Sequence, residues 1–265
     1  MNAPMRPAAT GTPVIAVENV TVRFGGIVAL DGIEFDIRDG EILGLIGPNG
    51  AGKTTLFNCL SRLYTPNDGD IRFNGTSILG EPAHRIAGLG IGRTFQNVAS
   101  FSNLSVRDNI RVGAHSASKS DPISDALRLP WVRRGERDID ARVQELIDWL
   151  ELNEVADLPV SGLPFGTQKR VEMARAMATE PKLLLLDEPA GGLNHDEVEE
   201  LGKLIRMVRD EKGVTVLLVE HHMALVMSVS DRVVVLNFGR KIAEGTPEEV
   251  QKNPEVIAAY LGGDE

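Results

Sequence analysis

A short glycine-rich segment, Gly47–Thr54, has the residue types and spacing of a loop that binds phosphates. Such a loop surrounds phosphates with backbone N–H groups, and it needs glycine where the chain turns tightly or approaches the ligand. Lys53 is placed to bridge the β- and γ-phosphates of a nucleotide, and the Thr54 hydroxyl is placed to bind Mg²⁺. The alternative is a glycine-rich turn that matches by chance. It is disfavoured because the apolar run Ile42–Ile46 precedes the loop and the helical stretch Lys53–Leu63 follows it. The predicted nucleotide contacts in this segment are Gly47, Pro48, Asn49, Gly50, Ala51, Gly52, Lys53, Thr54 and Thr55.

Two adjacent acids, Asp187 and Glu188, follow the apolar run Leu183–Leu186. In open α/β sheets, ligands bind at the carboxyl ends of the strands, so both acids are expected at that edge. Asp187 suits a direct or indirect contact with Mg²⁺, and Glu188 is then free to polarise the water that attacks the γ-phosphate. The alternative, a strand that simply ends in exposed acids, loses weight once the chain also contains a phosphate-binding loop. The two motifs together predict a P-loop nucleoside triphosphatase in which Lys53 and Glu188 are catalytic.

The elements that must position these residues alternate strand and helix, which is typical of an α/β fold with a parallel sheet. Shorter strands near the N-terminus are separated by glycine-containing turns and predict an additional antiparallel sheet. Asn194 with Glu197, and Thr246 with Glu249, are spaced as capping boxes at helix starts. Strands are predicted at Ile15–Arg23, Ile33–Ile37, Ile42–Ile46, Ile71–Asn74, Leu183–Leu186, Val214–Val219 and Val233–Leu236.

The stretch 103–157 differs from the rest and predicts an inserted helical region. Ile139, Val143, Leu146, Ile147 and Leu150 recur at helical spacing and form one apolar face. Residues 114–138 show little periodicity, so they are predicted to be a loop-rich insert.

Beyond the two strong motifs, the chain resembles the family of ABC ATPases from about Val14 to Leu261. The resemblance implies a P-loop core with a parallel sheet, an antiparallel β subdomain and an inserted α-helical subdomain. It implies one such domain over 14–265, with the core and antiparallel strands in 14–102 and 158–265 and the helical subdomain in 103–157. Residues 1–13 are predicted to be a flexible tail.

The resemblance also assigns roles to residues whose types alone say little. Gln96 is similar to the glutamine that reaches Mg²⁺ and the attacking water, so it is expected to be catalytic and to contact the metal with Thr54 and Asp187. His221 is similar to the histidine that holds the γ-phosphate, and Phe24 to the aromatic residue that stacks on adenine. The signature loop, which acts on ATP bound by a partner subunit, corresponds to Leu163, Pro164, Phe165, Gly166, Thr167 and Gln168. The D-loop corresponds to Ala190, Gly191, Gly192, Leu193 and Asn194. The implied ligands are ATP and Mg²⁺.

The signature loop departs from the family pattern at two positions. Pro164 replaces the usual serine and has neither a hydroxyl nor an N–H group, and Thr167 replaces a glutamine. We expect the Gly166 amide, together with Thr167 at the start of the following helix, to cap the partner-bound phosphate instead, because a helix N-terminus favours anions.

Within the family, the chain is most similar to ATP-binding subunits of branched-chain amino acid transporters. This likeness rests on Arg93–Asn97, on Glu220–Met223 and on the C-terminal run Glu244–Gly262. It implies an importer whose partners are transmembrane permease subunits, a second ABC ATPase subunit (a heterodimer, with a homodimer left open) and, indirectly, a periplasmic solute-binding protein. ABC ATPases that act on ribosomes or DNA, and subunits that bind ATP without useful hydrolysis, are the alternatives.

Composition agrees with a protein that reaches the membrane only through partners. Lys and Arg number 28 against 38 Asp and Glu, which gives a net charge of -10 and argues against nucleic acid as a partner. Cys59 is the only cysteine, which excludes an intrachain disulfide. No apolar run approaches the roughly 20 residues needed to span a bilayer, and residues 1–13 lack the apolar stretch of a signal peptide. The expected location is the cytoplasmic side of a bacterial inner membrane.

Overall fold

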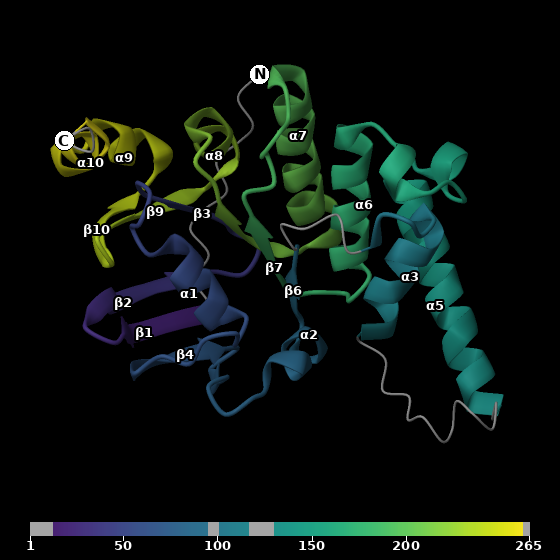
Figure 1. Cartoon of the computed structure of the whole chain (residues 1–265), viewed down its shortest axis with the longest axis horizontal. Coiled ribbons are helices and arrows are strands. Elements are labelled where there is room, and N and C mark those ends of the chain that lie inside the picture. The colour runs from purple at the N-terminus through teal and green to yellow at the C-terminus, as the bar shows by residue number, and fades with distance from the viewer. Residues whose placement is uncertain (1–12, 95–100, 117–129, 262–265) are drawn as a thin grey trace.

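The computed structural model describes residues 13–94, 101–116 and 130–261. Two β-sheets form the body of this part of the molecule, and helices cover them (Figure 1). The smaller sheet is antiparallel and has the strand order β2-β1-β4-β5. Its strands are β1 (Ile15–Phe24), β2 (Ile27–Ile37), β4 (Asp68–Phe73) and β5 (Thr76–Ser77).

The larger sheet carries the motifs and has the strand order β10-β9-β3-β8-β7-β6. Every pairing in it is parallel except that of β10 with β9. Because β8 lies between β3 and β7, the glycine-rich loop after β3 and the acids at the end of β7 meet at one edge of the sheet. The strands are β3 (Ile42–Ile46), β6 (Ile91–Arg93), β7 (Leu183–Asp187), β8 (Thr215–Val219), β9 (Arg232–Asn237) and β10 (Arg240–Gly245).

Helices cover both faces of the larger sheet. The helix α1 packs in a core shared with the smaller sheet, whereas α6 and α7 pack in the core on the opposite face. The helices are α1 (Lys53–Leu60), α2 (Ile86–Leu89), α3 (Val106–Ser116), α5 (Pro130–Trp149), α6 (Phe165–Met177), α7 (His195–Lys212), α8 (Met223–Val229), α9 (Pro247–Lys252) and α10 (Pro254–Leu261).

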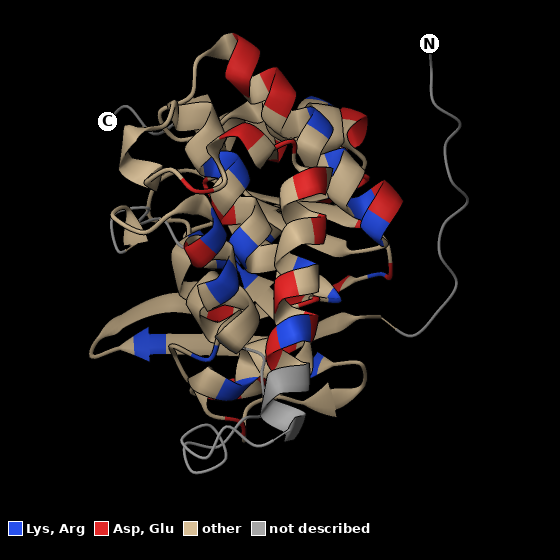
Figure 2. Cartoon of the chain, turned by 90° about the vertical axis from the view of Figure 1, so that its right-hand side faces the viewer, with Lys and Arg blue, Asp and Glu red and all other residues tan. Residues whose placement is uncertain are grey.

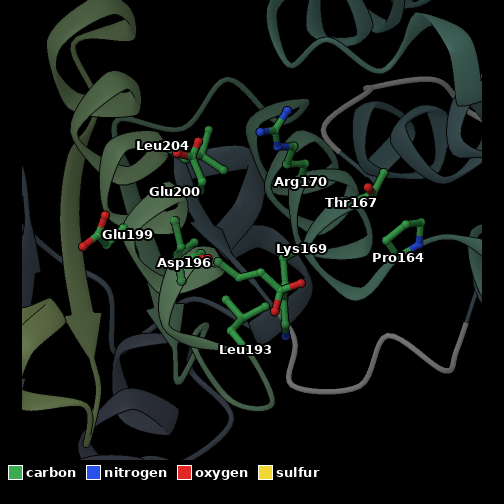
Figure 3. Close-up of a pocket in the computed structure, with 12 residues that line it drawn as sticks. Pro164, Thr167, Lys169, Arg170, Leu193, Asp196, Glu199, Glu200 and Leu204 are labelled. Carbon is green, nitrogen blue, oxygen red and sulfur yellow. The ribbon is translucent and has the colours of Figure 1, made fainter.

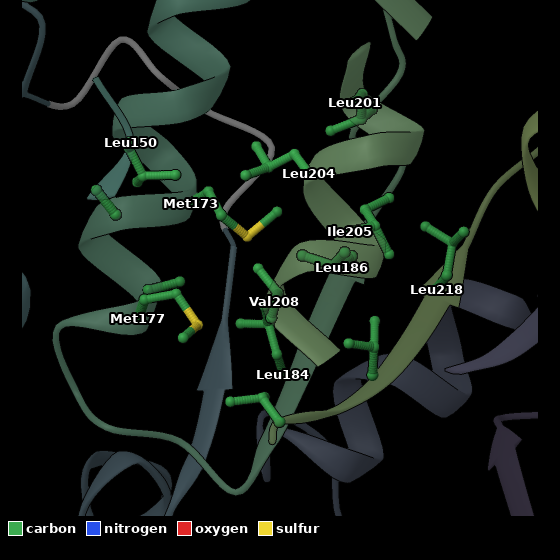
Figure 4. Packing of buried hydrophobic residues seen from close by; sticks show 14 of the residues in the cluster. Leu150, Met173, Met177, Leu184, Leu186, Leu201, Leu204, Ile205, Val208 and Leu218 are labelled. Carbon is green, nitrogen blue, oxygen red and sulfur yellow. The ribbon is translucent and has the colours of Figure 1, made fainter. Parts of the chain in front are cut away.

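Side chains of β7 alternate between these two cores, as the pleat of a strand requires. Leu183 and Leu185 face the α1 side, and Leu184 and Leu186 face α7. All four are fully buried, and each contributes roughly 1.5–3 kcal/mol. Both faces of β7 are therefore fixed, which fixes the position of the acids that follow. Figure 4 shows the α7 side, with labels on Leu150, Met173, Met177, Leu184, Leu186, Leu201, Leu204, Ile205, Val208 and Leu218.

The predicted helical region is present as α3 and α5, which pack on α6. The predicted apolar face of α5 is buried, from Ile139 to Leu150. The prediction of a loop-rich stretch over 114–138 was wrong at both ends, because α3 continues to Ser116 and α5 begins at Pro130. Proline suits the first turn of a helix. Residues 135–138 of α5 are glycine or charged and are exposed, because this end of the helix projects from the core (Figure 1). Helical periodicity was therefore absent from the sequence there.

Other predicted boundaries shift by a few residues. The second strand begins at Ile27 rather than Ile33, since Ile27 pairs with Phe24 across the Gly25-Gly26 turn. The helix after the glycine-rich loop ends at Leu60 rather than Leu63. The helix expected after the signature loop, α6, begins within that loop at Phe165, with Pro164 as its N-cap residue. Both predicted capping boxes, at Asn194 and Thr246, are confirmed.

Candidate functional site

The glycine-rich loop is shaped by close backbone contacts that exclude side chains. A Cβ atom on Gly47 would lie 2.2 Å from the carbonyl oxygen of Leu236, and one on Gly52 would lie 2.8 Å from that of Ala29. Gly50 and Gly52 also have φ angles of 78° and 102°, in the left-handed region that disfavours other residues. Gly52 is the N-cap of α1 and no side chain caps that helix, so its first amides are open to an anion.

Lys53 lies at the centre of this loop and is buried. Its Nζ donates hydrogen bonds to the carbonyl oxygens of Gly47 and Pro48, at 2.6 and 3.1 Å. Burial lowers the pKa of Lys53, and the nearby charge of Glu188 acts in the opposite direction. The ammonium group is thus held within the loop, within reach of the Glu188 charge, where its own charge is poorly screened by water.

Asp187 is buried and paired with an arginine that the sequence did not single out by itself. Asp187 Oδ2 accepts a hydrogen bond of 3.1 Å from Arg93 Nη2, and the side chains are 2% and 15% exposed. The Arg93 guanidinium also donates to Asn58 and Ser61 of the α1 region and stacks 4.6 Å from the centre of the Phe57 ring. Burial raises the pKa of Asp187, Arg93 opposes this, and the charges of Glu188 and Glu220 add to it.

The second oxygen of Asp187 is available to a cation. Among the described residues, the buried Oδ1 has no hydrogen-bond partner. Thr54, in the first turn of α1, is exposed. A carboxylate oxygen and a hydroxyl are ligand types that Mg²⁺ prefers, so the residues present fit this ion.

Glu188 adopts a strained backbone conformation directly after β7. Its φ angle is 46°, which for a residue other than glycine costs roughly 1–3 kcal/mol. Its amide donates to the carbonyl oxygen of Val219 at 2.8 Å, and this bond fixes the turn against β8. Strained residues of this kind are concentrated at functional sites. The structure thus brings Lys53, Asp187 and Glu188 together, as expected from the sequence.

Of the three residues assigned by resemblance, the structure describes His221 and Phe24 but not Gln96. His221 follows β8, its side chain is 65% exposed, and its Nδ1 lies 3.9 Å from an oxygen of Glu220. Phe24 is 47% exposed at the end of β1 and makes an edge-to-face contact with Tyr64, with ring centres 5.3 Å apart. Gln96 lies outside the described residues, although Thr94 just before it bonds to Leu185 of β7 at 3.0 Å.

The signature loop and the D-loop lie against each other within this chain. A Cβ atom on Gly192 of the D-loop would lie 3.0 Å from Cε1 of Phe165. Gln168 closes the first turn of α6, since its amide donates to Pro164 and its side chain to Leu163. A groove of about 590 Å³ separates the starts of α6 and α7 here, on the opposite face of the sheet from α1 (Figure 3). Its lining includes Pro164, Thr167 and Leu193.

The sequence analysis did not assign a role in the site to three residues that contact it, namely Arg93, Tyr64 and Glu220. Arg93 and Glu220 appeared only within motif strings, and the partners that give them a role lie far away in the sequence. For Tyr64, the one available signal was an aromatic residue just after the predicted nucleotide-binding helix.

Comparison with known proteins agrees with this architecture. The model of the ABC transporter family matches residues 30–191, and that of the branched-chain amino acid ATP-binding cassette transporter matches residues 240–265. The chain is 44% identical over 250 residues to the high-affinity branched-chain amino acid transport ATP-binding protein BraF of Pseudomonas aeruginosa, covering 94% of this chain and 98% of that one. It is 43% identical over 250 residues to LivG of Escherichia coli K12, a protein of the same description, with the same coverage.

The fold is also that of solved cassettes. The crystal structure of the ADP conformation of MJ1267, an ATP-binding cassette of an ABC transporter, superposes with a TM-score of 0.84 at 27% identity, covering 95% of this chain and 100% of that one. The predicted α/β fold with its two sheets is therefore confirmed. The chain belongs to the ABC transporter family, as an ATP-binding subunit of the branched-chain amino acid type.

Proposed function

We propose that this chain hydrolyses ATP to drive import of branched-chain amino acids or similar small solutes through partner subunits. ATP hydrolysis is the activity of its family. The solute comes from the printed function of BraF and LivG. The observation that carries the proposal is the meeting of Lys53, Asp187 and Glu188 at one edge of the parallel sheet.

In this proposal each side chain has one task. Lys53 exchanges its loop carbonyls for the oxygens of the β- and γ-phosphates, and the backbone N–H groups of the loop 47–55, which Pro48 lacks, surround the phosphates. Glu188 orients a water for in-line attack on the γ-phosphate and accepts its proton, and His221 and Gln96 hold the transferred group and the water. Phe24 stacks on adenine. Thr54, Asp187 and Gln96 would hold Mg²⁺, which, when bound, neutralises charge that develops on the phosphates.

The site is completed by other proteins. The signature loop 163–168 and the D-loop 190–194 serve ATP held by a second ATPase subunit, so ATP draws two subunits together. Permease subunits carry the solute, and a periplasmic solute-binding protein delivers it. The chain then acts at the cytoplasmic face of the inner membrane.

No helix in the described part of the chain is both long and apolar enough to cross a membrane. On the side shown in Figure 2, Lys and Arg alternate with Asp and Glu along the helices, and a nucleic acid would favour a continuous basic face instead.

Replacing Glu188 with Gln tests the proposed chemistry. Gln keeps the size of the side chain but cannot accept the proton, so turnover should fall by about 10²–10⁴-fold. Affinity for ATP, measured by equilibrium binding, should stay within about threefold of wild type because Glu188 contributes little to ground-state binding.

The matched control is Glu154→Gln, which removes an exposed acid in the helical turn after α5 and should leave both quantities unchanged. Normal hydrolysis by the Glu188→Gln variant would refute the assignment of Glu188. Failure of the wild-type chain to bind ATP with Mg²⁺ would refute the proposed function as a whole.

A further inference from the structure

Glu220 is a fully buried carboxylate that the mechanism above does not use. It follows β8 directly and its side chain is 0% exposed. Burying a carboxylate costs several kcal/mol unless strong hydrogen bonds replace its water. The partners that Glu220 has therefore indicate what it does.

The two oxygens of Glu220 accept hydrogen bonds from two separate loops. Oε1 accepts from the amide of Ala190, at 2.6 Å. Oε2 accepts from the amides of His221 and His222, at 3.1 and 3.2 Å. Ala190 begins the D-loop, and His221 is the residue expected to hold the γ-phosphate. Hydrogen bonds to an ionised carboxylate are about twice as strong as neutral ones, so each loop is firmly tied to the same side chain.

Neighbouring backbone bonds make this link short and stiff. The amide of Glu188 donates to Val219, the residue before Glu220, at 2.8 Å. The amide of Gly191 donates to Glu188 at 3.2 Å. The end of β8 and the start of the D-loop are thus joined twice, once through the backbone and once through Glu220. A displacement of the His221 loop must either move the D-loop or break a bond to a buried charge.

The D-loop in turn contacts the signature loop. Gly192 has a φ angle of 83° and lies so close to the Phe165 ring that a Cβ atom would be 3.0 Å from Cε1. A shift of the D-loop should therefore displace the Phe165 ring at the start of α6.

We propose that Glu220 is a positioning residue that couples the γ-phosphate end of this chain's own ATP site to its partner-facing D-loop. The inference rests on the proposed function, since it needs ATP at the P-loop and His221 at the γ-phosphate. Only a carboxylate of this length serves both loops. Gln would turn an NH₂ group toward a backbone N–H group, and Asp is shorter by about 1.5 Å and reaches one loop only.

Amide hydrogen exchange on the full-length chain, with and without ATP and Mg²⁺, tests the coupling. In the wild type, nucleotide should slow exchange both in the loop 47–54 and in the D-loop 190–194. In Glu220→Gln and in Glu220→Asp, slowing should persist at 47–54 and disappear at 190–194. Without nucleotide, the amides of Ala190, His221 and His222 should exchange about ten- to a hundredfold faster in Glu220→Gln than in wild type.

The control variant is Glu41→Gln. Glu41 is also buried, accepts a backbone hydrogen bond from Arg38 at 2.7 Å and bonds to Arg232, but it precedes β3 at the opposite edge of the sheet. We expect Glu41→Gln to lower the stability of the chain without changing how nucleotide slows exchange in the D-loop. This separates coupling from a structural contribution of any buried carboxylate.

Three outcomes would overturn the inference. The first is a normal nucleotide response at 190–194 in Glu220→Gln or Glu220→Asp. The second outcome can be tested on the wild type alone, even if neither variant folds. The amides of Ala190, His221 and His222 share one acceptor side chain, so their protection from hydrogen exchange should be similar. Protection factors that differ by more than about tenfold among these three amides would contradict the link. The third is a wild-type chain in which ATP fails to slow exchange at 47–54, which would refute the ATP site itself and this coupling with it.

Discussion

The two halves of an ABC ATP site, which in this chain are the phosphate loop and the signature loop, are built in opposite ways. The phosphate loop is fixed by its own chain, because the Gly47 and Gly52 backbones are packed against neighbouring carbonyls and Lys53 is bonded within the loop. The signature loop has few such constraints. Gln168 donates to the Leu163 carbonyl within it, but Phe165 is 38% exposed, and a Cβ atom on Gly166 would approach no atom more closely than 3.4 Å.

The difference follows from what each half binds. The phosphate loop must hold a triphosphate presented to one chain, so its shape is set before the ligand arrives. Under the proposed function, the signature loop meets its phosphate only when a second subunit approaches, so its contacts are completed from outside. Substitutions such as Pro164 and Thr167 are tolerable in the second half for this reason, whereas any side chain at Gly47 would collide with the carbonyl oxygen of Leu236.

Among variants that test the contrast between the two loops, Lys53→Ala in the phosphate loop should have the largest effect. Loss of the charge that faces the β- and γ-phosphates should weaken ATP binding by about 10²–10³-fold. Because burial lowers the pKa of Lys53, its charged form is costly in the empty site. The nucleotide-free variant should therefore melt no lower than wild type, as measured by calorimetry.

Lys182→Ala is the matched control for this prediction. Lys182 is an exposed lysine next to β7 at the amino edge of the same sheet, and its loss should change neither binding nor melting. If Lys53→Ala instead unfolds the chain and loses ATP only for that reason, the phosphate loop is not independently preformed and the contrast with the signature loop fails.

Sequence patterns predicted the first half better than the second for physical reasons. The phosphate loop, the acidic pair and the capping boxes at Asn194 and Thr246 are local, so neighbouring residues determine their geometry. The parallel strands could be recognised in the sequence because both of their faces are buried, which makes them continuous apolar runs.

The interactions that were missed join distant parts of the chain. Arg93 and Asp187 are 94 residues apart, and Glu220 and Ala190 are 30 apart. Nothing in the residue types near Arg93 or Glu220 reveals these pairings, because they depend on which strands lie side by side. The start of α5 was missed for a different reason, since a helix that projects from the core needs no apolar periodicity.

A smaller effect is expected from Thr167→Ala in the signature loop. If Thr167 and the Gly166 amide together cap the partner's phosphate, ATPase activity of the assembled transporter should fall by about tenfold, the effect of one lost hydrogen bond to a charged group. ATP binding by this chain alone should not change. Thr167→Ser keeps the hydroxyl and should restore activity, whereas full coupled activity in Thr167→Ala would show that Thr167 has no such role.

The smallest effect concerns the helix that carries the signature loop. Glu172 of α6 lies 3.1 Å from Lys169, and the two side chains are only 7% and 10% exposed. Burial raises the pKa of Glu172 despite the opposing charges of Lys169 and Arg175. A raised pKa means that the protonated form favours folding. That stability is fully present below the pKa of the unfolded chain and is lost as pH rises through the pKa of the folded chain.

Ionised Glu172 therefore weakens the fold near neutral pH, and Glu172→Gln should relieve this cost. The variant should be more stable than wild type at pH 7.5 by about 1 kcal/mol, or about 2–4 °C in Tm, and the gain should shrink toward pH 5. Glu200 and Lys203 have the same i,i+3 spacing on α7 but are exposed, so Glu200→Gln should show no such pH-dependent gain. A loss of Tm in Glu172→Gln that is equal at both pH values would show that the buried pair stabilises α6, and that the second half of the site is more firmly built than its exposed start indicates.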